Sequence, residues 1–254
     1  MKIKLFQIHL DEVDSTNNVL KDRCRELPDA TFLSADFQRA GRGRMNRKWH
    51  SPRGENVYAS FLMKSFQDPF TATLVSSVSV VRTLRHYAPD GAFHIKWPND
   101  VYSGERAKIA GILSEYVADF SFPEQSGKGA VIAGMGVNVN SGAESLSAFD
   151  QDATSLFCLL GRRINLKNFT EKLAETLEEC YISGLKDPDL LFSEWKRENF
   201  LIGRQLEFLF PGGERIRSEF ADIARNGEAL IRMADGSLRP FGCGDVRVIK
   251  ESMN

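Results

Sequence analysis

The sequence predicts an α+β protein in which a mixed β-sheet with helices is followed by a small all-β region. Residues 71–87 carry apolar side chains at helical spacing, whereas residues 56–64 form a largely apolar, strand-like run. Beyond about Ile202 the pattern changes to short strands separated by turn-forming residues. With 254 residues and 42% hydrophobic content, the chain can bury a substantial core. We therefore expect a large domain over residues 1–200 and a small one over residues 201–254.

The first elements expected are a short helix and two strands. Asp14–Asn18 is typical of a helix start, because a serine or threonine hydroxyl can accept hydrogen bonds from the free N–H groups there. This helix should continue to about Arg25. Strands are predicted over Thr31–Asp36 and Asn56–Lys64, and the first of them leads into a loop rich in arginine and glycine.

The central part of the chain continues the mixture of helices and strands. Leu74, Val78, Val81 and Leu84 share one face of the helix predicted over residues 71–87. The further strands predicted are 93–97, which stops at a proline, 108–117 and 130–139, and the further helices are 169–185 and 189–199.

The C-terminal region contains three turn signals at short intervals. These are Pro211–Gly213, Arg225–Gly227 and Asp235–Gly236, whose glycines and small polar residues suit tight turns between strands. Their spacing favours a small antiparallel barrel or sandwich of about 50 residues rather than a sheet covered by helices.

The composition excludes several classes of protein. The net charge is −1, from 33 basic and 34 acidic residues, whereas a dedicated nucleic-acid-binding protein usually carries a basic excess across its whole domain. No apolar run approaches the roughly 20 residues that a membrane helix needs, and no signal-peptide pattern is present. The four cysteines show no C-x-x-C spacing. We therefore expect a cytoplasmic protein that binds neither nucleic acid nor membrane.

The segment Gln38–Trp49 combines flexible backbone with four arginines and a lysine. Glycines allow backbone N–H groups to approach an anion closely, and guanidinium groups bind phosphate or carboxylate oxygens in pairs. The segment, which we call the arginine-glycine loop, is therefore predicted to bind an anion. On its own the pattern is also compatible with a nucleic-acid-binding arm or a solvated loop.

Two further sites carry polar groups at strand ends. Asn99 and Asp100 follow a strand that ends at Pro98, and there they could hold a ribose, phosphates or Mg²⁺. An ordinary turn with a capping aspartate is the alternative. Lys108 begins an apolar strand, where its ammonium needs either an anionic partner or a path to solvent.

Taken together and in order, these motifs resemble those of the biotin protein ligases. The resemblance covers about residues 10 to 140 and is specific because the motifs occur together. It rests on Ser15–Asn17, Gln38 with Gly41–Arg44 and Arg47–Trp49, Lys96–Asp100, Lys108 with Ala110–Leu113, and Gly134 with Gly136–Asn138.

The resemblance implies both a reaction and a fold. Biotin and ATP would form biotinyl-5′-adenylate and pyrophosphate, and a lysine of an acceptor protein would then attack the adenylate and release AMP. The acceptor would be a biotin carboxyl carrier protein or domain of a biotin-dependent carboxylase, and Mg²⁺ would accompany ATP. The fold implied is a mixed sheet with helices packed on one face, as in class II aminoacyl-tRNA synthetases, followed by a small SH3-like β-barrel. The protein would be a monomer or a homodimer.

The resemblance also implies roles for particular residues. The residues expected to be catalytic are Arg42, Arg44, Arg47 and Lys108. Those expected to contact biotin are Ser15, Thr16, Asn17, Gln38, Gly41, Arg42, Gly43, Arg44, Lys108, Gly111, Gly134 and Gly136. Those expected to contact ATP are Arg44, Arg47, Lys48, Trp49, Asn99, Asp100 and Asn138, with Asp100 also a candidate ligand of the metal.

The sequence also departs from relatives in two ways. Some members carry a DNA-binding domain before the catalytic domain, whereas the Asp-Ser-Thr motif here begins at residue 14, so we expect no operon repression. Asn46 stands where many members have glycine, which we expect to slow closure of a loop that is mobile without ligand. Two alternative functions remain, a lipoate or octanoate protein transferase and a non-catalytic biotin sensor.

Overall fold

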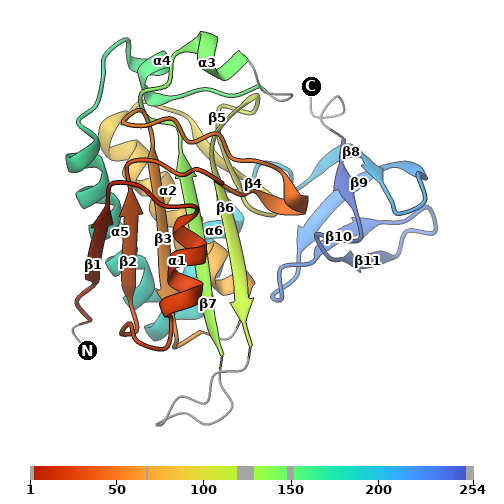
Figure 1. Ribbon diagram of the computed structural model, residues 1–254. Helices are drawn as coiled ribbons and strands as arrows, with labels where there is room; N and C mark the ends of the chain where they lie inside the picture. Colours follow the sequence, from red (N-terminus) through yellow and green to blue (C-terminus); the bar gives the residue numbers. More distant parts are fainter. Residues whose placement is uncertain (1–2, 67, 119–128, 148–151, 250–254) are drawn as a thin grey trace.

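The computed structural model describes residues 3–66, 68–118, 129–147 and 152–249 and contains two β-sheets (Figure 1). The larger sheet has seven strands in the order β1-β2-β3-β7-β6-β5-β4. Only β1 and β2 are parallel neighbours in this described sheet, so it is mixed, as the sequence predicted. Its strands are β1 (Phe6–Leu10), β2 (Thr31–Ala35), β3 (Val57–Met63), β4 (Phe93–Lys96), β5 (Asp100–Ser103), β6 (Ala107–Val117) and β7 (Ala130–Val137).

Three long helices cover one face of this sheet, and a short helix lies on the other (Figure 1). The three are α2 (Pro69–Tyr87), α5 (Leu166–Lys186) and α6 (Pro188–Arg197). Because side chains alternate along a strand, Phe61 joins the core beneath these helices, whereas its neighbour Leu62 faces α1 (Thr16–Arg23) on the opposite face. The predicted sheet with helices on one face is thus confirmed, and the predicted first helix, α1, lies on the opposite face.

Two helix starts differ in detail from their sequence signals. Helix α2 begins at Pro69, two residues before the predicted start, because the Asp68 carboxylate accepts hydrogen bonds from the N–H groups of Phe70 and Thr71. Helix α1 begins at Thr16 without a capping bond from the Ser15 side chain. There Oε1 of Gln38 accepts a hydrogen bond from the Thr16 N–H at 3.0 Å. A residue of the arginine-glycine loop therefore caps one of the free N–H groups at the start of α1.

The sequence patterns missed several short elements. These are the edge strand β1, the strand β5, the helices α3 (Ala143–Ser147) and α4 (Leu156–Leu160), and a 3-10 turn over Arg44–Asn46. Strand β5 changes the setting of one motif. Asp100 begins a strand that pairs with Lys96 of β4, so the Pro98–Asn99 turn joins a hairpin.

The second sheet is antiparallel and has the order β11-β10-β9-β8-β12. Its strands are β8 (Arg204–Leu209), β9 (Arg215–Ile223), β10 (Ala229–Arg232), β11 (Leu238–Phe241) and β12 (Arg247–Val248). This agrees with the predicted small barrel, while the domain boundary after residue 200 stays a prediction. The indole N–H of Trp97, in the β4–β5 turn, donates to the Gly227 carbonyl at 2.9 Å, and Lys196 of α6 pairs with Asp222 of β9 at 2.7 Å. The second sheet is therefore held against the β4–β5 turn and α6.

Among the described residues, no helix is long and apolar enough to cross a membrane.

Candidate functional site

A cavity of about 1010 Å³ opens between the larger sheet, the arginine-glycine loop and the second sheet. Of the residues assigned to the site from the sequence, only Gly41 does not line it. The others are Ser15, Thr16, Asn17, Gln38, Arg42, Gly43, Arg44, Arg47, Lys48, Trp49, Asn99, Asp100, Lys108, Gly111, Gly134, Gly136 and Asn138. Motifs that are separated by up to 123 residues in the sequence, from Ser15 to Asn138, therefore meet at one place.

A polar network forms one end of the cavity. Ser60 Oγ lies 2.7 Å from Thr16 Oγ1 and 2.6 Å from Asn17 Oδ1. Thr16 Oγ1 in turn donates to Gln38 Oε1 at 3.1 Å, and Gln38 Nε2 donates to Ser51 Oγ at 3.0 Å. The network joins α1, β3 and the loop, and it presents hydroxyl and amide groups to the cavity. Ser60 and Ser51 were not assigned from the sequence, since a single serine in a strand or loop gives no signal.

Glycines on β6 and β7 form the floor beside this network. Gly111 and Gly136 are paired across the two strands. A Cβ atom at Gly134 would lie 2.4 Å from Asn17 Oδ1, and one at Gly136 would lie 2.3 Å from the indole ring of Trp49. The floor therefore has no room for larger side chains at either of these two positions.

Trp49 packs against the glycine floor. One of its ring carbons would lie 3.1 Å from a Cβ at Gly111, and the Lys108 ammonium stands 5.4 Å from the ring centroid. Its buried Nε1 has no hydrogen-bond partner among the described residues. The Trp49 backbone N–H donates to the Gly41 carbonyl at 2.9 Å, which explains why Gly41 belongs to the loop without facing the cavity.

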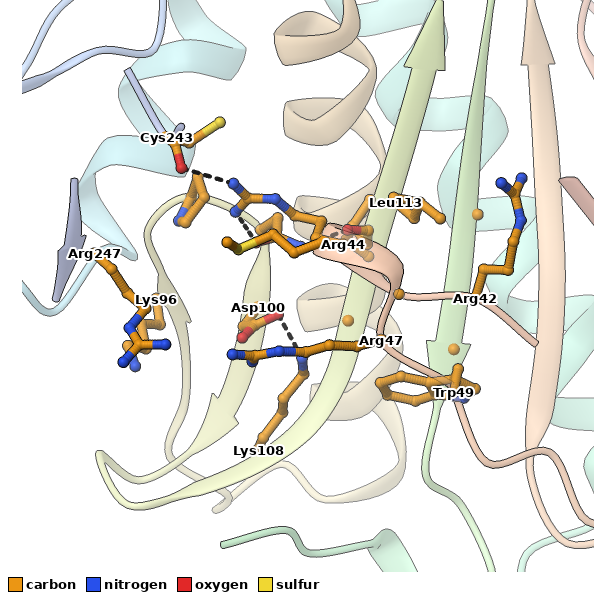
Figure 2. Close-up of a pocket in the computed structure, with 18 of the residues that line it drawn as sticks. Arg42, Arg44, Arg47, Trp49, Lys96, Asp100, Lys108, Leu113, Cys243 and Arg247 are labelled. Atoms are coloured by element: carbon orange, nitrogen blue, oxygen red, sulfur yellow. Dashed lines mark hydrogen bonds and ion pairs between the residues drawn. The ribbon is translucent and has the colours of Figure 1, made fainter. Parts of the chain in front are cut away.

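Lys108 meets an anion from the protein itself. Its Nζ lies 2.6 Å from Asp100 Oδ1, and the two side chains are only 13% and 21% exposed. The sequence expectation that an ammonium at the start of this strand needs an anionic partner is thus met by Asp100 (Figure 2).

Arg44 connects the loop to two other parts of the chain. Nη1 donates to Asn99 Oδ1 and Nη2 donates to the Cys243 carbonyl, each at 2.9 Å. The Asn99 side chain is fixed at its other end, because Nδ2 donates to the Ile112 carbonyl at 2.6 Å. Arg44 therefore joins the loop, the β4–β5 hairpin and the segment before β12.

Further cations gather near Lys108. Arg47 and Lys48 are exposed, and Figure 2 shows the Arg47 side chain extending toward Asp100 and Lys108. Lys96 and Arg247 also line the cavity. Arg247 comes from β12, and sequence reasoning missed it because one arginine in a short strand resembles any solvated residue.

Arg42 points away from this group (Figure 2) and pairs with Glu115, which does not line the cavity. Its Nη2 lies 2.7 Å from Glu115 Oε2, and Lys21 Nζ lies 2.9 Å from Glu115 Oε1. Burial by itself would raise the pKa of Glu115, but the hydrogen bonds from Asn17 and Lys21, with the charges of Arg42 and Lys21, outweigh it and lower that pKa.

The donors suited to a metal ion are few within the cavity. Asp100 is the acidic residue next to Lys108, whereas Asn138 uses Nδ2 to donate to the Thr154 carbonyl at 3.1 Å. Among the described residues, the group of three metal-ligand side chains lying within 4.8 Å of one another is His9, Asp11 and Asp36, and none of these lines the cavity. Mg²⁺ often uses only one or two carboxylates and takes its other ligands from phosphates and water. The carboxylate of Asp100 fits such a site.

Comparisons with known proteins agree on one family. The Biotin/lipoate A/B protein ligase family matches residues 10–138. The bifunctional ligase/repressor BirA of Salmonella typhimurium is 32% identical over 243 residues, which cover 93% of this chain and 72% of that protein. The biotin–[acetyl-CoA-carboxylase] ligase of Mycobacterium tuberculosis is 27% identical and covers 86% of this chain and 79% of its own.

A solved structure supports the same relationship over almost the whole chain. The biotin protein ligase from Aquifex aeolicus in complex with biotin and ATP has a TM-score of 0.78 and 28% identity, and it covers 96% of this chain and 98% of its own. The chain therefore belongs to the biotin/lipoate A/B protein ligase family.

Proposed function

We propose that this protein is an ATP-dependent biotin protein ligase. The observation that carries the proposal is a single cavity in which a polar pocket adjoins a cluster of cations. The pocket contains Thr16, Asn17 and Gln38, and the cluster contains Lys108 and Arg44. Biotin has a polar ureido ring at one end and a carboxylate at the other, so the cavity offers matching groups at both ends. The Aquifex aeolicus relative was solved with both biotin and ATP.

The polar network would bind the ureido ring. A ureido group carries two N–H donors and one carbonyl acceptor, and hydroxyl and amide side chains can satisfy both kinds of group. Ser15, Thr16, Asn17 and Gln38 are the residues that we assign to this end. The glycine floor of β6 and β7, with Gly111, Gly134 and Gly136, would let the bicyclic ring and the aliphatic chain lie against backbone.

The cations would serve the adenylation step. A carboxylate oxygen of biotin attacks the α-phosphorus of ATP, the P–O bond to the leaving pyrophosphate breaks, and biotinyl-5′-adenylate remains. Two anions must approach each other, so the catalyst has to neutralise both and align them. We assign this task to Lys108 and Arg44, and contact with the triphosphate to Arg47 and Lys48. Arg42, which points away from Lys108 and pairs with Glu115, would act at the biotin pocket.

Nucleotide contacts are proposed for the rest of the cavity. Trp49, Asn99, Asp100 and Asn138 would face ATP. Mg²⁺ bound to the triphosphate would neutralise charge on the leaving pyrophosphate, and Asp100 is the residue that we assign to it.

The transfer step needs no protein nucleophile. The neutral amine of an acceptor lysine attacks the acyl carbon of the adenylate, the bond to AMP breaks, and the amine loses a proton as the amide forms. The acceptor class that we propose is the biotin carboxyl carrier protein or domain of a biotin-dependent carboxylase. All four cysteines are free thiols, which supports our proposal of a cytoplasmic location.

The decisive experiment is pyrophosphate release with ATP and Mg²⁺, comparing biotin, lipoate and octanoate. We expect release that depends on biotin, followed by label transfer to a purified biotin carboxyl carrier domain. Preference for lipoate or octanoate would instead identify a lipoyl-type transferase, and biotin binding without pyrophosphate release would identify a sensor. Either result would overturn the proposal.

A further inference from the structure

We propose that Glu115 is a positioning residue for biotin, acting through Asn17 and Arg42 rather than by contact with the substrate. This inference rests on the proposed function, because it concerns the pocket assigned above to biotin. Glu115 lies on β6 and does not line the cavity, whereas Asn17 and Arg42 both line it. Its effect on the reaction would therefore pass through those two side chains.

The carboxylate of Glu115 gathers donors from two other segments of the chain. Oε2 accepts hydrogen bonds from Asn17 Nδ2 at 2.8 Å and from Arg42 Nη2 at 2.7 Å. Oε1 accepts a bond from Lys21 Nζ at 2.9 Å. Asn17 and Lys21 are one turn apart on α1, and Arg42 belongs to the arginine-glycine loop. Glu115 thus connects α1 and the loop to the strand that carries Lys108 and Gly111.

The first consequence is a fixed orientation of the Asn17 amide. A carboxylate without a proton can only accept hydrogen bonds, so Asn17 must turn its NH₂ group toward Glu115. Nδ2 also donates to the Leu113 carbonyl at 3.2 Å, and Oδ1 is then directed to Ser60 and to the bare backbone of Gly134. Glu115 and the Leu113 carbonyl together orient Asn17 so that its acceptor end, and not its donor end, faces the floor of the pocket.

The second consequence is an anchor for the loop. Arg42 and Lys48 form an antiparallel bridge, so the loop closes on itself as a small hairpin. Several of its side chains reach the rest of the site: Gln38 bonds Thr16, Trp49 packs on the glycine floor and Arg44 bonds Asn99. A further contact is the ion pair of Arg42 with Glu115, whose side chain is 20% exposed. Removal of the carboxylate would leave Arg42 without this contact and the loop less firmly held over the biotin pocket.

The chain offers a matched control for the structural effect of losing such a pair. Glu198 also receives two hydrogen bonds from an arginine, Arg85, at 3.0 and 2.6 Å, and its side chain is 12% exposed. Neither Glu198 nor Arg85 lines the cavity. Loss of this pair should lower the stability of the protein without changing its KM for biotin.

The test compares Glu115→Gln and Glu115→Ala with Glu198→Ala in the full chain. KM for biotin, KM for ATP and kcat are measured by pyrophosphate release, and stability is measured by thermal unfolding. We expect the biotin KM of Glu115→Ala to rise about 10-fold, because hydrogen bonds from charged groups are strong, with a smaller rise for Glu115→Gln. Glu198→Ala should lower the melting temperature and leave the biotin KM unchanged.

Two further readouts separate positioning from a structural role. Trypsin should cut the loop of Glu115→Ala faster than that of Glu198→Ala when no ligand is present, since only the first has lost the Arg42 contact. Arg42→Gln combined with Glu115→Ala should raise the biotin KM by less than the product of the two single effects, because the residues act as a pair.

The outcomes distinguish this inference from the function on which it rests. Absence of biotin-dependent pyrophosphate release in the unmodified protein would refute the proposed function. Normal activity of the unmodified protein with an unchanged biotin KM in Glu115→Ala would refute the positioning role alone. Equal effects of Glu115→Ala and Glu198→Ala on stability, without a difference in loop cleavage, would also refute the positioning role alone.

Discussion

Lys108 Nζ lies 2.6 Å from Asp100 Oδ1, so the ammonium assigned to catalysis is already paired with a carboxylate of its own chain. Asp100 begins β5, and Lys108 lies near the start of the neighbouring β6. The pair removes the cost of a cation without a partner in a partly buried place. It also means that the carboxylate of biotin and the α-phosphate of ATP would share Lys108 with Asp100.

Replacement of Lys108 should separate chemistry from binding. For Lys108→Ala we expect kcat for pyrophosphate release to fall about 100- to 1,000-fold, the range seen when one group that stabilises developing charge is removed. Biotin binding, measured by calorimetry, should weaken much less, because the ureido end of the pocket is unchanged. Lys172→Ala, at an exposed helical pair with Glu175, provides the control. Full activity of Lys108→Ala would contradict the role assigned to it.

Asp100 can be tested through the metal. For Asp100→Asn we expect a higher Mg²⁺ concentration at half-maximal activity, because an amide oxygen is a weaker ligand for Mg²⁺ than a carboxylate. The measurement is a Mg²⁺ titration of pyrophosphate release at saturating biotin and ATP. A fall in kcat with an unchanged Mg²⁺ requirement would instead mean that Asp100 acts only by pairing with Lys108.

Much of the larger sheet was predictable because its long elements repeat their patterns over many residues. Helix α5 buries one apolar face, α2 is buried along most of its length, and β3 and β7 are almost wholly apolar strands. Strand β1 was missed because its five residues are mostly exposed, and β5 because a proline and a turn precede it. Short elements depend on partners that are distant in sequence, which local patterns do not reveal.

The site likewise contains residues that local sequence patterns predicted and residues that they did not. The residues assigned to the site were found because each motif is local, and all of them except Gly41 line the cavity. Their partners were not found, since Ser60, Glu115 and Arg247 come from three different strands and carry no local signal. For Lys108 the sequence indicated that its ammonium could require an anionic partner, but it did not identify Asp100 as that partner.

A methyl group on the glycine floor should disturb the site. In Gly136→Ala the new Cβ would lie 2.3 Å from the Trp49 indole, so the ring and the loop that carries it must move. We expect KM for both biotin and ATP to rise, with a melting temperature within a few degrees of the original. Gly142→Ala is the matched control, because no atom lies within 4 Å of the place its Cβ would take and its backbone needs no positive φ. Equal kinetics of the two variants would show that Trp49 is not part of the site.

Closure of the arginine-glycine loop can be followed by limited proteolysis. The loop exposes Arg47 and Lys48, and Arg42 is 39% exposed, so trypsin should cut it in the absence of ligands. Bound biotin and ATP would neutralise these like charges and draw the loop over the cavity, as closing lids do. We expect protection from trypsin with both substrates together, greater than with either alone. Cleavage at the same rate in all four conditions would contradict closure.

Acid should weaken the protein partly through Glu115. Burial favours a higher pKa for this carboxyl, but bonds from Asn17 and Lys21 and the charge of Arg42 lower it below its ordinary value of 4.5. A group whose pKa is lowered by folding stabilises the native state above its unfolded pKa, and that contribution is lost as pH falls through the folded value. The difference in free energy of unfolding between the unmodified protein and Glu115→Gln should therefore be constant above about pH 5.5, beyond the unfolded pKa, and should shrink below pH 4.5.

The measurement is urea unfolding at a series of pH values, and Glu198→Gln should behave in the same way. Its pKa is also lowered, because the hydrogen bonds and charge of Arg85 outweigh burial. What separates the two residues is activity, since only Glu115→Gln should also raise the biotin KM. A difference in unfolding free energy that did not change with pH would show that the ionised carboxylate of Glu115 adds nothing to stability. The contact between Glu115 and Arg42 would then act as a hydrogen bond and not through the negative charge of the carboxylate.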